Sequence, residues 1–125
     1  MFHLLLVMLG GAIGAGARHL TGRAALALWG PAFPWGTLIV NVVGGLLMGV
    51  LVGALAARAS GDEALRALLG VGVLGGFTTF SAFSLDTLLM LQRNEVWTAL
   101  FYILASVILS IAALFAGLQM TRAMA

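Results

Sequence analysis

The chain has 125 residues, of which 62% are hydrophobic and only 8% charged, with a formal net charge of +2 and no cysteine. Soluble domains carry about a quarter of charged residues, so this chain has too few charges to cover a surface that faces water. The composition indicates a single-domain integral membrane protein, residues 1–125, and excludes disulfides. The arginines are scattered and form no basic cluster of the kind that binds nucleic acid.

Four apolar segments are long enough to cross a bilayer. A spanning helix needs about 20 apolar residues, and polar or proline-containing stretches at residues 29–34, 58–63 and 92–95 separate four such runs. We therefore expect helices at about residues 2–28, 35–57, 65–91 and 96–119. The predicted fold class is an all-α membrane protein with four transmembrane helices, whose even number puts both termini on one side.

The first span combines closely spaced glycines with a charged residue. Gly10 and Gly14 are four residues apart, a spacing at which small residues let two helices approach closely. Arg18 lies well inside the apolar run, where a position at the bilayer centre would cost about 3 kcal/mol on insertion scales. We therefore expect Arg18 to lie near an aqueous entrance, where it would concentrate anions.

The second span repeats the glycine spacing and adds a polar pair. Gly45, Gly49 and Gly53 recur every four residues, which favours close contact either with a helix of the same subunit or with a second subunit. Thr37 and Asn41 are also four residues apart, so they share one helix face at membrane depth.

The third span contains the stretch from Gly75 to Ser84, GGFTTFSAFS. Paired glycines and paired threonines weaken a helix, so we expect the third helix to break near Gly75–Thr79. Unwound backbone survives at membrane depth only where protein covers it or where it lines a cavity. A break frees carbonyls that suit Na⁺ or K⁺, and N–H groups that suit anions. If two antiparallel copies cross there, carbonyls of both would converge on one cation.

Two kinds of side chain follow the predicted break. Phe80 and Phe83 lie three residues apart on one face. Because the edge of an aromatic ring is positive, this pair either receives an anion or packs as an aromatic stripe.

Asp86 is the only acid well inside a span, and a carboxylate there is usually functional. It is a candidate proton or cation site, a candidate partner of Arg18, or an interfacial residue.

The fourth span carries a regular polar stripe. Thr98, Tyr102, Ser106 and Ser110 follow one another every four residues and therefore share one helix face. Hydroxyl groups donate as well as accept hydrogen bonds, so an uncharged track of this kind could replace the water shell of a small anion. The alternative is that the hydroxyls bond to carbonyls or across helices and hold the bundle together.

The six arginines are divided evenly between the two sides of the membrane. Three fall on the side of the first and third connections (Arg18, Arg23 and Arg93), and three fall on the side of the termini (Arg58, Arg66 and Arg122). The positive-inside rule needs an asymmetry to set one orientation. The balance therefore predicts insertion in both orientations and an antiparallel dual-topology homodimer, although counts this small also balance by chance.

The stretch GGFTTFSAFS resembles the third-helix signature of the Fluc (CrcB-type) fluoride channels, G-G-x-T-T-F-S-x-F-S. Residues 10–14 with Arg18, residues 36–44, and Tyr102 with Ser106 and Ser110 resemble the motifs of the other three helices, so the resemblance covers nearly the whole chain. His19 and Asp86 depart from the tyrosine and glutamate that are common in the family, and the shorter acid draws its carboxylate back by one methylene.

The resemblance implies a function and a role for each matching residue. The family forms dual-topology homodimers in the bacterial cytoplasmic (inner) membrane, with two antiparallel pores that let fluoride leave the cell passively. By similarity, backbone carbonyls of Gly75 and Thr78 hold a central structural Na⁺, and Arg18 lies near the vestibule. The implied pore residues are Asn41, Phe80, Phe83, Tyr102, Ser106 and Ser110, with further polar contacts from Thr37 and Ser81.

Three other functional classes fit the sequence less well than a fluoride channel. The chain has no phosphate-binding motif of the form G-x-x-x-x-G-K-[ST] and no paired acid–base or nucleophile constellation, so neither an ATP-driven pump nor an enzyme is expected. A small dual-topology proton-coupled multidrug transporter would also have four short spans. It needs a deep membrane carboxylate, but the first span has no acid and Asp86 comes late in the third.

Overall fold

The computed structural model describes residues 1–58 and 62–124, and these are helical throughout apart from short connections. Four helical segments in this part of the chain are long and apolar enough to cross a membrane, so the predicted all-α architecture with four spans is confirmed. They are α1 (Phe2–Trp29), α2 (Trp35–Ala56), a composite third span and α6 (Val96–Met124). The third span comprises α3 (Glu63–Leu65), η1 (Arg66–Leu74), α4 (Gly75–Phe77) and α5 (Ser81–Gln92).

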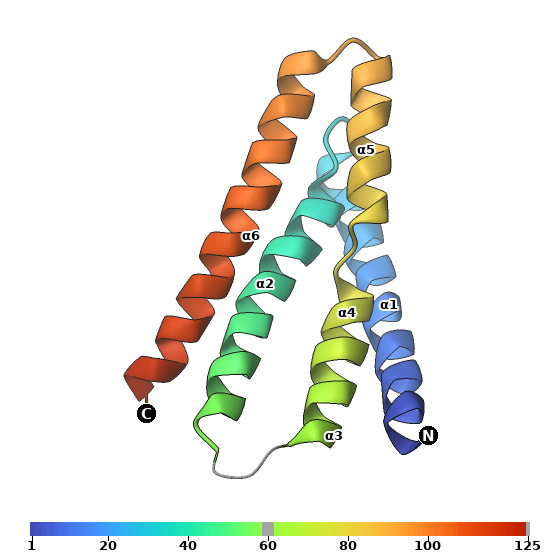
Figure 1. The fold of residues 1–125 in the computed structure, drawn as a ribbon. Helices are drawn as coiled ribbons and strands as arrows, with labels where there is room; N and C mark the ends of the chain where they lie inside the picture. The colour runs from blue at the N-terminus through green and yellow to red at the C-terminus, as the bar shows by residue number, and fades with distance from the viewer. Residues whose placement is uncertain (59–61, 125) are drawn as a thin grey trace.

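The two termini lie at the same end of the bundle, as an even number of spans requires (Figure 1). At the other end, a tight turn joins α1 to α2. Its first residue, Gly30, has φ of +76° and donates its N–H to the carbonyl of Leu26. A positive φ of this size favours glycine, which has no Cβ to clash. The turn between α5 and α6 contains Asn94 with φ of +60°, and asparagine tolerates the left-handed region better than most residues.

Helices α2 and α6 run side by side (Figure 1), and the glycines of α2 make this approach possible. A Cβ at Gly45 would lie 2.7 Å from the carbonyl oxygen of Ser110, and one at Gly49 would collide with the backbone at Leu114. Gly117 of α6 meets the backbone of α2 in the same way. The glycine repeat of the second span therefore serves packing within one subunit.

A second glycine contact joins α1 to the third span. A Cβ at Gly76 would lie 2.6 Å from the carbonyl oxygen of Gly11. Gly10 and Gly14 lie equally close to the backbone of η1. The bundle thus consists of two backbone-to-backbone helix pairs, α1 with η1 and α4, and α2 with α6.

The third span is irregular in two places. Residues Arg66–Leu74 form a π-helix, a rare conformation that often marks functional segments and that the sequence pattern did not indicate. The span then bends: Thr78 has extended backbone angles (φ −82°, ψ 158°), and helical geometry resumes at Ser81. The predicted break at Gly75–Thr79 thus corresponds to a bend at residues 78–80, and Gly75 and Gly76 themselves are helical.

The interior of the single chain is small. Its buried cluster consists of Leu38, Met90, Ala99 and Tyr102, at the end where α2, α5 and α6 meet. Large apolar side chains cover the outside of the bundle instead, among them Phe2, Leu5, Trp97, Phe101 and Phe115. An apolar surface of this extent must face lipid or another protein chain.

Candidate functional site

A groove of about 550 Å³ runs between α2, the bend of the third span and α6. It brings together residues that are up to 73 positions apart in the sequence and contains seven of the residues predicted to be functional: Asn41, Gly75, Thr78, Phe80, Phe83, Ser106 and Ser110. None of the 14 residues that line it carries a formal charge. Any ion inside the groove would therefore be held by dipoles, hydroxyl groups or ring edges.

Two serines on the α6 wall of the groove have unsatisfied hydroxyl groups. The Oγ atoms of Ser106 and Ser110 are buried, and neither has a hydrogen-bond partner among the described residues. Serines in helices usually bond to the carbonyl one turn earlier, as Ser84 does to Phe80 at 3.0 Å. A buried polar group without a partner is costly, so these two hydroxyls are available to a ligand.

The aromatic pair lies at the α5 side of the groove. The ring centroids of Phe80 and Phe83 are 5.6 Å apart and the rings are tilted by 45°. Phe83 also packs 5.2 Å from the ring of Tyr102, which anchors it to the buried cluster. Phe80 has no such support, and 77% of it is exposed in the single chain.

Asn41 is bonded to the bend itself. Its Oδ1 accepts from the backbone N–H of Thr79 at 2.8 Å, and its Nδ2 donates to the carbonyl of Thr79 at 3.0 Å. This pair of bonds satisfies both backbone groups of one unwound residue. An amide nitrogen carries two N–H groups, so one donor of Asn41 remains for another acceptor.

The bend redirects the helical N–H donors of two carbonyls to side chains. In an unbroken helix, Thr79 N–H would bond to the carbonyl of Gly75, but it donates to Asn41 instead. Likewise, the N–H of Ala82 would bond to the carbonyl of Thr78, but it donates to the side chain of Thr79 at 3.2 Å. The two carbonyls freed in this way are those that the resemblance assigns to a cation.

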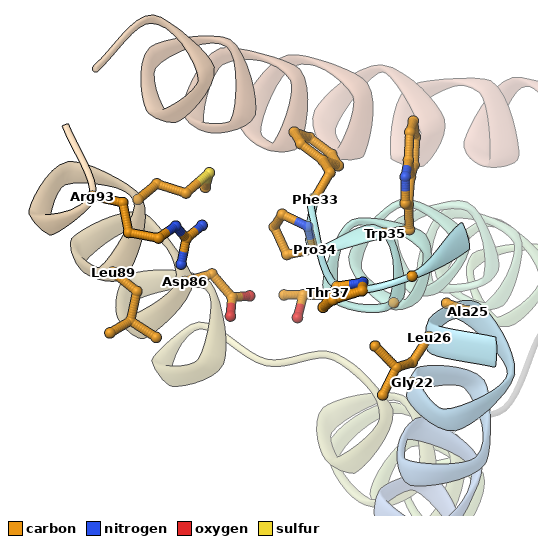
Figure 2. A pocket seen from close by; sticks show the side chains of 14 residues that line it. Gly22, Ala25, Leu26, Phe33, Pro34, Trp35, Thr37, Asp86, Leu89 and Arg93 are labelled. Atoms are coloured by element: carbon orange, nitrogen blue, oxygen red, sulfur yellow. The ribbon is translucent and has the colours of Figure 1, made fainter. Parts of the chain in front are cut away.

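Four predicted residues lie outside the lining of the groove. Tyr102 is fully buried in the cluster, and its hydroxyl donates to Oδ2 of Asp86 at 3.0 Å. Thr37 lines a separate cavity of about 320 Å³, where it faces Asp86 near Arg93 (Figure 2). Ser81 is exposed at the start of α5, and its hydroxyl lies 3.5 Å from that of Thr79.

Arg18, the fourth of these residues, is bonded to the backbone of the third span and not to Asp86, the acid well inside that span. Its Nε donates to the carbonyl of Gly76 at 3.0 Å, whereas the bond found for Asp86 is to Tyr102. Arg18 also lines a cavity of about 290 Å³ with His19, Arg23 and Thr79. The described residues contain no cluster of three or more His, Cys, Asp or Glu side chains that could hold a metal ion.

Sequence reasoning missed three of these contacts. The partners of Asn41, Arg18 and Tyr102 are 38, 58 and 16 residues away, respectively. No local spacing encodes such pairs. The indirect signal was the coincidence of polar residues on the first, second and fourth spans with a stretch of weak helix formers on the third.

The fold and the groove define a multi-pass membrane protein with an uncharged groove between α2, the bend of the third span and α6. Residues 5–118 match the family described as CrcB-like protein, Camphor Resistance (CrcB), and the chain belongs to this family. It is 59% identical over 122 residues to a protein of Chelativorans sp. (strain BNC1), with 98% of each chain covered.

Two further relatives are similar over nearly their whole length. A protein of Sphingopyxis alaskensis is 52% identical over 122 residues, which cover 98% of this chain and 97% of the relative. A protein of Caulobacter vibrioides (strain NA1000 / CB15N) is 56% identical over 123 residues, with the same coverage. All three relatives carry the name fluoride-specific ion channel FluC.

Proposed function

We propose that this chain is a fluoride-selective ion channel and not an enzyme, and that it conducts F⁻ passively out of the cytoplasm. The family membership and the names of the relatives support the transported ion. The observation that carries the proposal is the uncharged groove with two orphaned serine hydroxyls. A channel must bind its ion well enough to admit it and weakly enough to release it, and neutral donors meet both conditions better than a fixed cation.

The α6 wall of the groove supplies the donors. Fluoride is small and strongly hydrated, so it enters only where hydrogen bonds replace its water shell. The hydroxyls of Ser106 and Ser110 lie one helical turn apart, and both lack a hydrogen-bond partner among the described residues. The remaining N–H of Asn41 provides a third donor on the facing helix. Together they form the groove part of a track that Tyr102 and Thr37 continue toward the cavity beside Asp86.

The aromatic pair supplies the rest of the coordination. Ring edges carry partial positive charge, so Phe80 and Phe83 can face an anion without a counter-charge that would trap it. The exposed ring of Phe80 is suited to a pore that a second subunit completes. Arg18 would lie at the vestibule, since the cavity that it lines also contains His19 and Arg23. Ser81 would add a polar contact for the ion.

The functional unit is an antiparallel dual-topology homodimer with two pores. One chain encloses little, because its groove is open on one side and its outer surface is apolar. The even division of arginines allows insertion in both orientations. In a bilayer the bend acts as a helix break, which is tolerated where two subunits cover it. The location is the bacterial cytoplasmic (inner) membrane.

The dimer centre is suited to a structural Na⁺. The carbonyls of Gly75 and Thr78 are freed by the bend, and neutral oxygens of this kind are the ligands that hard cations prefer. When bound, the ion would neutralise converging carbonyl dipoles and join the two subunits. Each subunit keeps these two oxygens free because the side chains of Asn41 and Thr79 accept the N–H groups that would otherwise bond to them.

The test is fluoride efflux from liposomes that contain the purified protein, read with a fluoride electrode after addition of a K⁺ ionophore. A parallel chloride measurement provides the control. Fast fluoride release without chloride release is the expected result. If well-folded dimers release no fluoride, the proposal fails, and uptake of a cationic drug driven by a proton gradient would then test the transporter alternative centred on Asp86.

A further inference from the structure

Arg18 belongs to α1, yet the bond found for it is to the backbone of the third span. The Nε–H group donates to the carbonyl of Gly76 at 3.0 Å across 58 residues of sequence. The contact is possible because α1 and α4 touch backbone to backbone at Gly11, Gly14 and Gly76. Arg18 follows Gly14 by one helical turn, so its side chain lies on the same face as this contact.

The carbonyl that Arg18 binds is one of four at the bend, those of residues 75–78, whose helical N–H donors would lie at residues 79–82. In an unbroken helix the carbonyl of Gly76 would accept from the N–H of Phe80, which lies beyond the extended residue Thr78. Two other carbonyls at the bend have also lost their helical donors. The N–H that would bond to Gly75 donates to the side chain of Asn41, and the N–H that would bond to Thr78 donates to the side chain of Thr79. Arg18 therefore supplies a replacement donor to Gly76 alone.

We propose that Arg18 is a positioning residue that holds the bend of the third span through its Nε–H bond to Gly76, and so determines which carbonyls stay free. A guanidinium at the end of a helical segment also interacts favourably with the last carbonyls and their dipole. The segment from Glu63 to Phe77 ends at this point. Arg18 and Asn41 thus hold the two sides of the bend from two different helices.

This role can be separated from that of a charge that attracts anions. The donor in the structure is Nε, and the side-chain nitrogen of glutamine is the same number of bonds from Cα as this atom. Arg18→Gln therefore keeps the donor in place and removes the charge. Arg18→Met places a methyl group at that position, and Arg18→Lys keeps the charge but moves the donor one bond further out.

The first readout is hydrogen–deuterium exchange of peptides that cover residues 74–84, with the protein in lipid nanodiscs. Loss of the donor leaves the carbonyl of Gly76 without a partner, and this penalty is large enough to speed local opening by about tenfold. We expect this acceleration in Arg18→Met and near-parental exchange in Arg18→Gln. Arg122, which is exposed in the last turn of α6 and lines none of the three cavities described above, provides the matched control as Arg122→Met.

The second readout, fluoride efflux, rests on the proposed function. We expect Arg18→Gln to retain more flux than Arg18→Met. If Arg18→Met fails to fold, the exchange rates of Arg18→Gln and Arg18→Lys still show whether the donor or the charge holds the bend. Fast exchange in Arg18→Gln together with parental exchange in Arg18→Lys would overturn the inference, because the positive charge and not the placed donor would then stabilise the bend. Unchanged exchange in every variant would also overturn it, because Arg18 would then have no effect on the bend. If the parent protein conducts no fluoride, the proposed function fails, and the exchange result still decides the role of Arg18.

Discussion

Removal of the two orphaned serine hydroxyls should stabilise the protein while it impairs conduction. Ser106 and Ser110 each bury an Oγ atom that has no hydrogen-bond partner in the described part of the chain. A buried polar group that lacks a hydrogen bond costs about 1–3 kcal/mol. We therefore expect Ser106→Ala and Ser110→Ala each to raise the free energy of unfolding by about 1 kcal/mol or more. Most substitutions in a packed protein lower the free energy of unfolding, so an increase would be a distinctive result.

The same hydroxyls are expected to carry fluoride. A hydrogen bond to a charged partner contributes about 1.5–3 kcal/mol, so each substitution should reduce fluoride flux by roughly 10- to 100-fold if that bond stabilises the ion in transit. Stability is measured by reversible unfolding in mixed micelles with increasing SDS. Flux is measured in liposomes from the same preparations.

A matched control separates the hydroxyl effect from helix propensity. Ser84 is exposed, and its hydroxyl is already bonded to the carbonyl of Phe80 at 3.0 Å. Ser84→Ala gains the same helix propensity but removes no orphaned group, so it should be near neutral in both assays. If Ser106→Ala and Ser110→Ala lower the free energy of unfolding, the hydroxyls have partners in the assembled protein. If flux is unchanged as well, neither serine lies in the ion path.

Three further predictions concern the rings, the bend and the helix packing. Phe80→Ile and Phe83→Ile should impair fluoride efflux and leave the dimer intact by size-exclusion chromatography; parental flux in both would refute a role for the ring edges. Asn41→Ala removes two hydrogen bonds to the bend, so it should destabilise the protein by about 2–6 kcal/mol, and an unchanged unfolding curve would contradict the contact. Gly49→Ala puts a Cβ against the α6 backbone and should cost about 1–3 kcal/mol, whereas Gly16→Ala, with no atom within 4 Å of the new Cβ, should not destabilise the protein.

Much of the architecture could be predicted from the sequence because it depends on local properties. The number of spans follows from the length of the apolar runs, and the turn at Gly30 follows from this glycine and the two prolines, Pro31 and Pro34, that come directly after it. The bend in the third span was indicated by glycines and threonines that weaken a helix, although the helix ends at Phe77 and not at the glycine pair. The π-helix of η1 left no comparable mark in residues 66–74.

The candidate site was only partly predictable. The period of the helix places Ser106 and Ser110 on one face, and the structure adds that both face the groove without partners. Tyr102 belongs to the same stripe, yet it is buried in the core against Asp86. The stripe therefore divides between a groove and a packed cluster because α5 covers one part of α6 and leaves the other open.

The sequence by itself determined what a single helix needs: apolar length, turn residues, weak points, and side chains that share a face. Only the tertiary structure decided which backbones touch, and with them the partners of Arg18 and Asn41. The physical reason is that glycine spacing lets another helix approach closely but does not specify which helix this is. The choice of α6 for the glycines of α2, and of η1 and α4 for those of α1, results from the packing of the whole bundle.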